Sequence, residues 1–164
     1  MDDRCQGERP GSEGFTLVEL MTVVLIIAIL IAIAIPTFFG ARDRAADREA
    51  QSLDRDALVA GKVVFTDSDT YVGITTADLQ QAETELKFVA AATPALARLK
   101  QVSVASGNTG GQSYLLAVTG ASSGRCFAAL ALSNSPTAYQ ELTLPTCSAS
   151  GFDPTVGPWL DSWP

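Results

Sequence analysis

The sequence contains no histidine and few cationic residues, and each shortage excludes a class of function. Without histidine, Ser-His-Asp and Cys-His catalytic arrangements cannot form, and a zinc site would lack its usual nitrogen ligand. The 164 residues include 11 Lys and Arg against 18 Asp and Glu, which gives a net charge of −7 and no basic cluster. General electrostatic affinity for nucleic acid is therefore disfavoured.

Other signs of catalysis are also missing from the sequence. We find no phosphate-binding glycine motif and no conspicuous pair of carboxylates. Ser122, Ser123 and the threonines are interpreted as turn and surface residues, and Asp67-Ser68-Asp69, which lacks EF-hand spacing, is interpreted as a solvated turn. We therefore predict no enzymatic activity, no cofactor and no metal site.

Cysteine is scarce, with three residues at Cys5, Cys126 and Cys147. If the part of the chain with the last two is exported, they lie where disulfides persist. Cross-linking a loop of about 20 residues would then stabilise the fold by about 3 kcal/mol. We predict a Cys126–Cys147 disulfide, with two unrelated buried thiols as the alternative.

The one long apolar stretch of the chain runs from Phe15 to Ile35 and is followed by Pro36. Glu19 is its only charged residue, and its other polar side chains are Thr16 and Thr22. At about 1.5 Å per residue the stretch makes roughly 32 Å of helix, which matches the ~30 Å hydrocarbon core of a bilayer. We therefore predict a membrane-spanning helix.

Glu19 requires an explanation, because a carboxylate in hydrocarbon is costly and usually has a functional partner. One explanation is that Glu19 lies one turn inside the helix and reaches the headgroups. A second comes from the sequence around it. Gly14-Phe-Thr-Leu-Val-Glu19 resembles the processing site of type IV prepilins, where a dedicated peptidase cuts after the glycine and methylates the new amine.

This resemblance extends from Gly14 through Pro36 and implies roles for three residues. Cleavage between Gly14 and Phe15 would remove Cys5 and leave an N-methylated α-amine on Phe15. Phe15 and Glu19 are four residues apart and share one helix face. In staggered copies, the carboxylate of one subunit could therefore pair with the amine of the next, as the resemblance implies for filament assembly. One departure from the family is Ala28, where many pilins have a helix-loosening glycine.

The second half of the predicted helix is amphipathic, so that one helix is expected from about Phe15 to Val63. Ala46, Ala50, Leu53, Ala57, Ala60 and Val64 repeat at spacings of four and three residues, which places them on one face. The opposite face is interpreted as polar, with Arg44, Asp47, Arg48, Asp54 and Arg55. Further along, Thr75 or Thr76 is expected to cap a short helix through Ala82, and residues 86–89 to form a strand or a connector.

The C-terminal half is rich in short β patterns. Residues 101–104, 113–118 and 125–130 are predicted strands, separated by the turn-forming stretches 106–111 and 120–124. Such connections predict an antiparallel meander. After Leu132 a loop is expected, and Trp159 and Trp163 are interpreted as packing or exposed contacts.

Together these patterns predict an α+β fold, in which the long helix packs on a small antiparallel sheet, the lollipop of pilins. Residues 1–14 are expected to be a leader, 15–36 the transmembrane and assembly helix, and 37–164 the extracytoplasmic domain. The resemblance implies a homo-oligomeric filament subunit and three kinds of partner: prepilin peptidase, an assembly platform and an ATPase-driven machine. Before assembly the subunit would lie in membrane lipid with its N-terminus cytoplasmic, and afterwards in an extracellular pilus.

Several alternatives share these features. A pseudopilin of a type II secretion system, a minor pilin and a membrane-anchored binding domain that never assembles would have the same N-terminal stretch. An ordinary secretory signal is a further rival, because Ala32-Ile33-Ala34 fits its cleavage pattern. That tripeptide, however, lies within the apolar stretch, which exceeds the ~7–15 residues usual for such signals.

Overall fold

The computed structural model describes residues 14–164, so that Cys5 and most of the predicted leader lie outside the described residues. The chain divides into two units, residues up to Phe39 and Gly40–Pro164, and helix α1 (Leu17–Ser68) contributes to both. In the described part, α1 alone is long and apolar enough to cross a membrane. The long helix predicted from Phe15 to Val63 is thus present, with slightly different ends.

The N-terminal unit consists of the apolar part of α1, which continues through Pro36. Proline has no N–H and normally weakens the preceding turn of a helix. The Thr37 hydroxyl donates to the carbonyl oxygens of Ala34 at 2.9 Å and Ile33 at 3.4 Å. This side chain binds backbone acceptors in the turn around the proline.

Helix α1 ends five residues later than predicted because its last turn contributes to the core. Val64 and Phe65 pack against buried residues, and the ring of Phe65 lies 4.5 Å from that of Tyr71, centroid to centroid. Asp69 then adopts a left-handed φ of 54°, and its N–H donates to the carbonyl oxygen of Phe65 at 2.8 Å. Such a residue is a common helix terminator, and it lies within the predicted turn.

The short helix α2 (Thr76–Ala82) forms where it was expected. Thr75 is its N-cap: the Thr75 side chain accepts from the Asp78 N–H, and the Asp78 carboxylate accepts from the Thr75 N–H at 2.8 Å. This reciprocal arrangement is a capping box.

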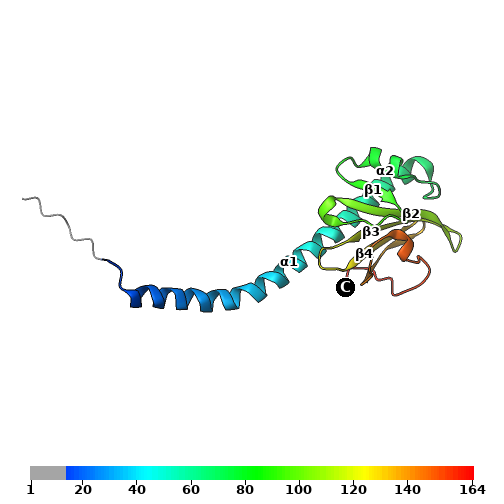
Figure 1. Ribbon diagram of the computed structural model, residues 1–164. Helices are drawn as coiled ribbons and strands as arrows, with labels where there is room; N and C mark the ends of the chain where they lie inside the picture. Colours follow the sequence, from blue (N-terminus) through cyan, green and yellow to red (C-terminus); the bar gives the residue numbers. More distant parts are fainter. Residues whose placement is uncertain (1–13) are drawn as a thin grey trace, which may run out of the picture. The chain divides into compact units, whose positions relative to one another are not determined.

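The Gly40–Pro164 unit contains a five-stranded sheet in the order β1-β2-β3-β4-β5. Its strands are β1 (Lys87–Ala90), β2 (Gln101–Thr109), β3 (Gln112–Gly120), β4 (Cys126–Leu132) and β5 (Ser135–Leu142). Short 3-10 helices, η1 (Ala97–Leu99) and η2 (Ala149–Gly151), lie before β2 and after β5. Figure 1 shows the strands beside the second half of α1. The predicted α+β class is confirmed.

One detail of the predicted sheet was wrong. The segment after Leu132 was expected to be loop, but it forms β5, an edge strand, where Pro136 is tolerated beside a register shift between Leu130 and Leu132. The predicted antiparallel meander is present in β2, β3 and β4, and residues 86–89, expected as a strand or a connector, contribute β1, which pairs with β2 in parallel. Residues 91–100, which include η1, connect these two strands.

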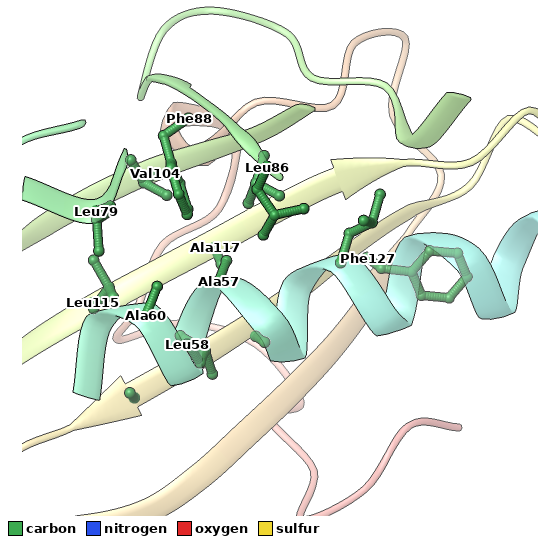
Figure 2. Packing of buried hydrophobic residues seen from close by; sticks show 14 of the residues in the cluster. Ala57, Leu58, Ala60, Leu79, Leu86, Phe88, Val104, Leu115, Ala117 and Phe127 are labelled. Carbon is green, nitrogen blue, oxygen red and sulfur yellow. The ribbon is translucent and has the colours of Figure 1, made fainter. Parts of the chain in front are cut away.

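The sheet is covered on both faces, because successive residues of a strand point to opposite sides. On one face Leu115 and Ala117 of β3 pack against Ala57 and Ala60 of α1, as Figure 2 shows. On the other face Leu116 and Val118 are covered by the C-terminal segment, which contains Cys147, Ala149 and Phe152. The interior strands are therefore buried on both sides.

The predicted apolar stripe of α1 faces the sheet, but its polar face was partly misassigned. Asp47 and Asp54 are buried, with exposed fractions of 4% and 0%. Asp54 lies four residues after Ala50 and three before Ala57, so that its position belongs to the buried stripe although its chemistry is polar. Thr119 of β3, which was interpreted as a surface or turn residue, is also fully buried, and its hydroxyl forms a hydrogen bond with the Asp54 carboxyl.

Asp47 is compensated by partners from the loop before β4. The Arg125 guanidinium forms an ion pair with Asp47, and the Ser123 hydroxyl donates to the same carboxylate at 2.5 Å. Arg125 also pairs with Glu141 of β5, with 2.8 Å between Nη1 and Oε1. This arginine therefore connects α1 to the far edge of the sheet, and Ser123 is more than a surface residue.

A disulfide joins Cys126 of β4 to Cys147, with 5.3 Å between their Cα atoms. Beyond it, the Cys147 carbonyl accepts from the Ala95 N–H at 2.8 Å, and the Ala149 N–H donates to Ser103 Oγ at 3.0 Å. The disulfide thus fixes a segment that packs on Leu116 and Val118 of β3. Without it, few backbone hydrogen bonds would hold that segment.

We expect Cys126→Ser to lower the free energy of unfolding by about 2–5 kcal/mol, the usual effect of losing a native disulfide in a small domain. Hydrogen exchange should increase first in residues 143–152. Urea denaturation of the oxidised wild type and the variant, both as uncleaved chains that retain Cys5, measures the difference, with Cys5→Ser as the matched control that should change nothing. Labelling of both Cys126 and Cys147 in native protein without reductant would contradict the expectation.

Candidate functional site

The candidate site is the N-terminal segment from Gly14 to Glu19. Gly14, Phe15 and Thr16 precede α1, and Phe15 is 86% exposed. A side chain built at Gly14 would meet no atom within 4 Å. Both residues of the predicted cleavage bond are thus open to a large partner in the described part of the chain.

Thr16 and Glu19 form a capping box at the start of α1. The Glu19 Oε2 atom accepts from the Thr16 N–H at 3.1 Å and from the Thr16 hydroxyl at 2.9 Å. In return the Glu19 N–H donates to Thr16 Oγ1 at 3.2 Å. These bonds satisfy backbone donors that the first turn of a helix would leave free.

This local role of Glu19 was not predicted from the sequence. The predicted partner, the α-amine of Phe15, exists only after cleavage, and in the uncleaved chain Thr16 is the partner. The signal was present in the sequence, since Thr-x-x-Glu before an apolar run is the pattern of a capping box. The cap fixes where the carboxylate lies relative to the first turn.

The apolar residues of α1 that follow Glu19 have no cover within their own unit. Large side chains from Leu20 to Ile35 are about half exposed or more, and none of the 18-residue apolar window is buried. A surface of this size cannot face water, so it requires lipid or other apolar helices. In residues 14–164 there is no cluster of three potential metal ligands. What the site offers is one carboxylate at the start of an uncovered apolar helix.

Comparison with known proteins identifies the class of this segment. Residues 9–35 match the model of the prokaryotic N-terminal methylation motif, a span that includes Gly14, Phe15 and Glu19. The chain is therefore a protein with an N-terminal methylation motif and an uncovered apolar helix. No solved structure matches the chain.

Two curated relatives are similar to part of the chain. The type IV major pilin protein PilA of Myxococcus xanthus is 45% identical over 62 residues, which are 38% of this chain and 28% of that protein. The type IV wide pilus major component PilA4 of Thermus thermophilus is 40% identical over 60 residues, which are 37% of this chain and 46% of that protein. The chain thus spans less than half the length of either relative. Over these spans the chain is similar to type IV major pilins, and the methylation motif and the α+β fold agree with that similarity.

Proposed function

We propose that the chain is a structural subunit of a type IV pilus. It would be cleaved between Gly14 and Phe15, N-methylated on Phe15 and polymerised through its N-terminal helix. The observation that carries the proposal is the Gly14–Glu19 motif directly followed by an apolar helix without cover in its own unit. Both relatives are named as major pilus components.

The physical basis of assembly is an exchange of apolar environments. Roughly twenty apolar side chains, at about 1–2 kcal/mol each, could not leave the bilayer for water. They leave when the same helices of neighbouring subunits replace the lipid. The filament core would then be a bundle of residues 15–36, with residues 37–164 outside it.

Glu19 would supply register between subunits. After cleavage, the charged amine of Phe15 in one subunit would pair with the carboxylate of Glu19 in the next. A charge pair in an apolar bundle is strongly distance-dependent, so it favours one stagger over its neighbours. The partners would be the prepilin peptidase, an assembly platform and its ATPase. The subunit would cross the membrane once, with the leader, residues 1–14, cytoplasmic.

We expect purified surface filaments to contain this chain as their main component, beginning at N-methylated Phe15. N-terminal mass spectrometry and the relative abundance of filament proteins test this. A small fraction of the chain in filaments made of another pilin would indicate a minor pilin, and its presence only in a secretion pseudopilus would indicate a pseudopilin. An intact leader in assembled filaments would overturn the proposed processing.

A further inference from the structure

Asp54 is a titratable group that filament assembly does not use, at the centre of the helix–sheet interface. Its side chain is fully buried, and its Oδ1 atom lies 2.7 Å from the hydroxyl of Thr119. Its Oδ2 atom is buried without any hydrogen-bond partner. An ionised carboxylate with one hydrogen bond and one bare oxygen is a costly arrangement in a protein interior.

The hydrogen bonds around Thr119 are incomplete if Asp54 is ionised. The Thr119 hydroxyl has one proton but two acceptors within reach, Asp54 Oδ1 at 2.7 Å and the Gln101 carbonyl oxygen at 3.3 Å. An ionised Asp54 would take that proton. A protonated Asp54 would instead donate to Thr119 Oγ1 and free the hydroxyl proton for Gln101. One added proton thus makes a continuous chain of hydrogen bonds from α1 to β3 and β2.

The surrounding charges do not favour an ionised Asp54. Strands β3 and β4 contain no charged residue. In the described residues Asp54 takes part in no ion pair, and the charged groups on neighbouring segments are exposed or paired with one another. These groups are Arg55 and Asp56 on α1, Lys87 of β1, Lys100 with Glu85, and Arg125 with Asp47 and Glu141. Burial accordingly raises the pKa of the Asp54 carboxyl well above its ordinary 3.8, and interactions with the side chain and the backbone of Thr119 offset only part of this.

We propose that Asp54 is a proton-binding site: it is a neutral carboxylic acid in the folded domain, and its proton links α1 to strands β3 and β2 through Thr119. The domain therefore takes up a proton when it folds. The packing of helix on sheet is tightest in mildly acidic surroundings and loosens as pH rises. This property is independent of the proposed function, because it lies in the Gly40–Pro164 unit.

The direction of the pH effect follows from the raised pKa. Between the ordinary value, 3.8, and the higher folded value, the unfolded chain has lost the Asp54 proton and the folded chain retains it. Stability contributed by this group is therefore fully present below the unfolded pKa and falls as pH rises, until the folded pKa is passed. For one proton the unfolding equilibrium constant increases by up to about tenfold per pH unit.

The test compares the full chain in detergent micelles with its Asp54→Asn variant, which keeps the shape but cannot ionise. Urea denaturation followed by tryptophan fluorescence gives the unfolding constants from about pH 5 to about pH 9. Asp56→Asn is the matched control, because Asp56 lies two residues away on α1, is exposed, and loses the same charge.

We expect the unfolding constant of the wild type, divided by that of Asp54→Asn, to rise by up to about tenfold per pH unit. The unfolding constant of the wild type, divided by that of Asp56→Asn, should not change with pH. A ratio to Asp54→Asn that is constant or falls with rising pH would overturn the proposal. Infrared spectroscopy of the wild type is independent of how the variant folds. It should show the carbonyl band of a protonated carboxyl at neutral pH, and absence of that band would also overturn it.

Discussion

Glu19→Ala should abolish filaments while leaving processing and the Gly40–Pro164 unit intact. The substitution would remove one member of the proposed charge pair between subunits and strand the amine of a neighbour in an apolar bundle. Breaking such a pair costs about 3–5 kcal/mol per contact, which is roughly a 150- to 5,000-fold loss in each subunit addition. In the membrane monomer the substitution removes a costly carboxylate, so its effect on membrane insertion should be neutral or mildly favourable.

The capping box offers a rival explanation that the experiment must separate. Glu19→Ala also removes the acceptor for the Thr16 N–H and hydroxyl. Losing an N-cap costs about 0.5–2 kcal/mol and frays one turn, which is too little to stop assembly by itself. Thr16→Ala is the matched control, because it breaks the cap from the other side and keeps the carboxylate.

We expect Thr16→Ala cells to form filaments and Glu19→Ala cells to form none, as counted by electron microscopy, with cleavage after Gly14 normal in both. Glu19→Gln should be partly defective, because the amide still accepts a hydrogen bond but has no charge. Wild-type filament numbers from Glu19→Ala, with no other pilin supplying the contact, would show that Glu19 merely reaches the headgroups. Equal loss of filaments in Thr16→Ala and Glu19→Ala would show that assembly depends on the capping box and not on the proposed charge pair.

Gly14→Val should block maturation and, as a consequence, filament formation. The block is expected to arise because the peptidase does not accept a valine side chain at this position. Within the chain itself a side chain at Gly14 meets nothing within 4 Å, so misfolding is not the expected cause. The variant should therefore fold, retain its disulfide and accumulate in the membrane with its leader attached. Gly11→Val places the same side chain elsewhere in the leader and is the matched control.

Mass spectrometry of membrane fractions measures the result. Gly14→Val should give only the uncleaved chain, whereas the wild type and Gly11→Val should give chains that begin at Phe15. A mature N-terminus at Phe15 in Gly14→Val would show that the glycine is not needed for cleavage. An N-terminus after Ala34 in any of them would favour an ordinary secretory signal instead.

Local patterns were sufficient for much of this protein. The apolar stretch and the alternating four- and three-residue spacing of alanines predicted α1, because helix periodicity is a property of a short window of sequence. Thr75 was one of two threonines expected to cap α2, and the two-residue turn at Gly110-Gly111, with φ of 56° and 80°, falls within a predicted turn. The Thr16–Glu19 cap was equally readable but was overlooked, because a more specific motif occupied the same residues.

Tertiary structure decided what depends on partners distant in the chain. Strand β5 contains a proline and little alternation, and it exists because β4 offers an edge to pair with. Asp47 is buried because Arg125 approaches it from the start of β4.

Asp54 shows most clearly which features were determined by the local sequence and which by the tertiary structure. Its spacing from Ala50 and Ala57, which places it on the buried stripe, was visible in the sequence, but its chemistry led to its assignment to the polar face. That its neighbour would be Thr119, 65 residues away, was not visible. Periodicity fixes which way a side chain points, whereas the group it meets depends on how the sheet is folded beneath it.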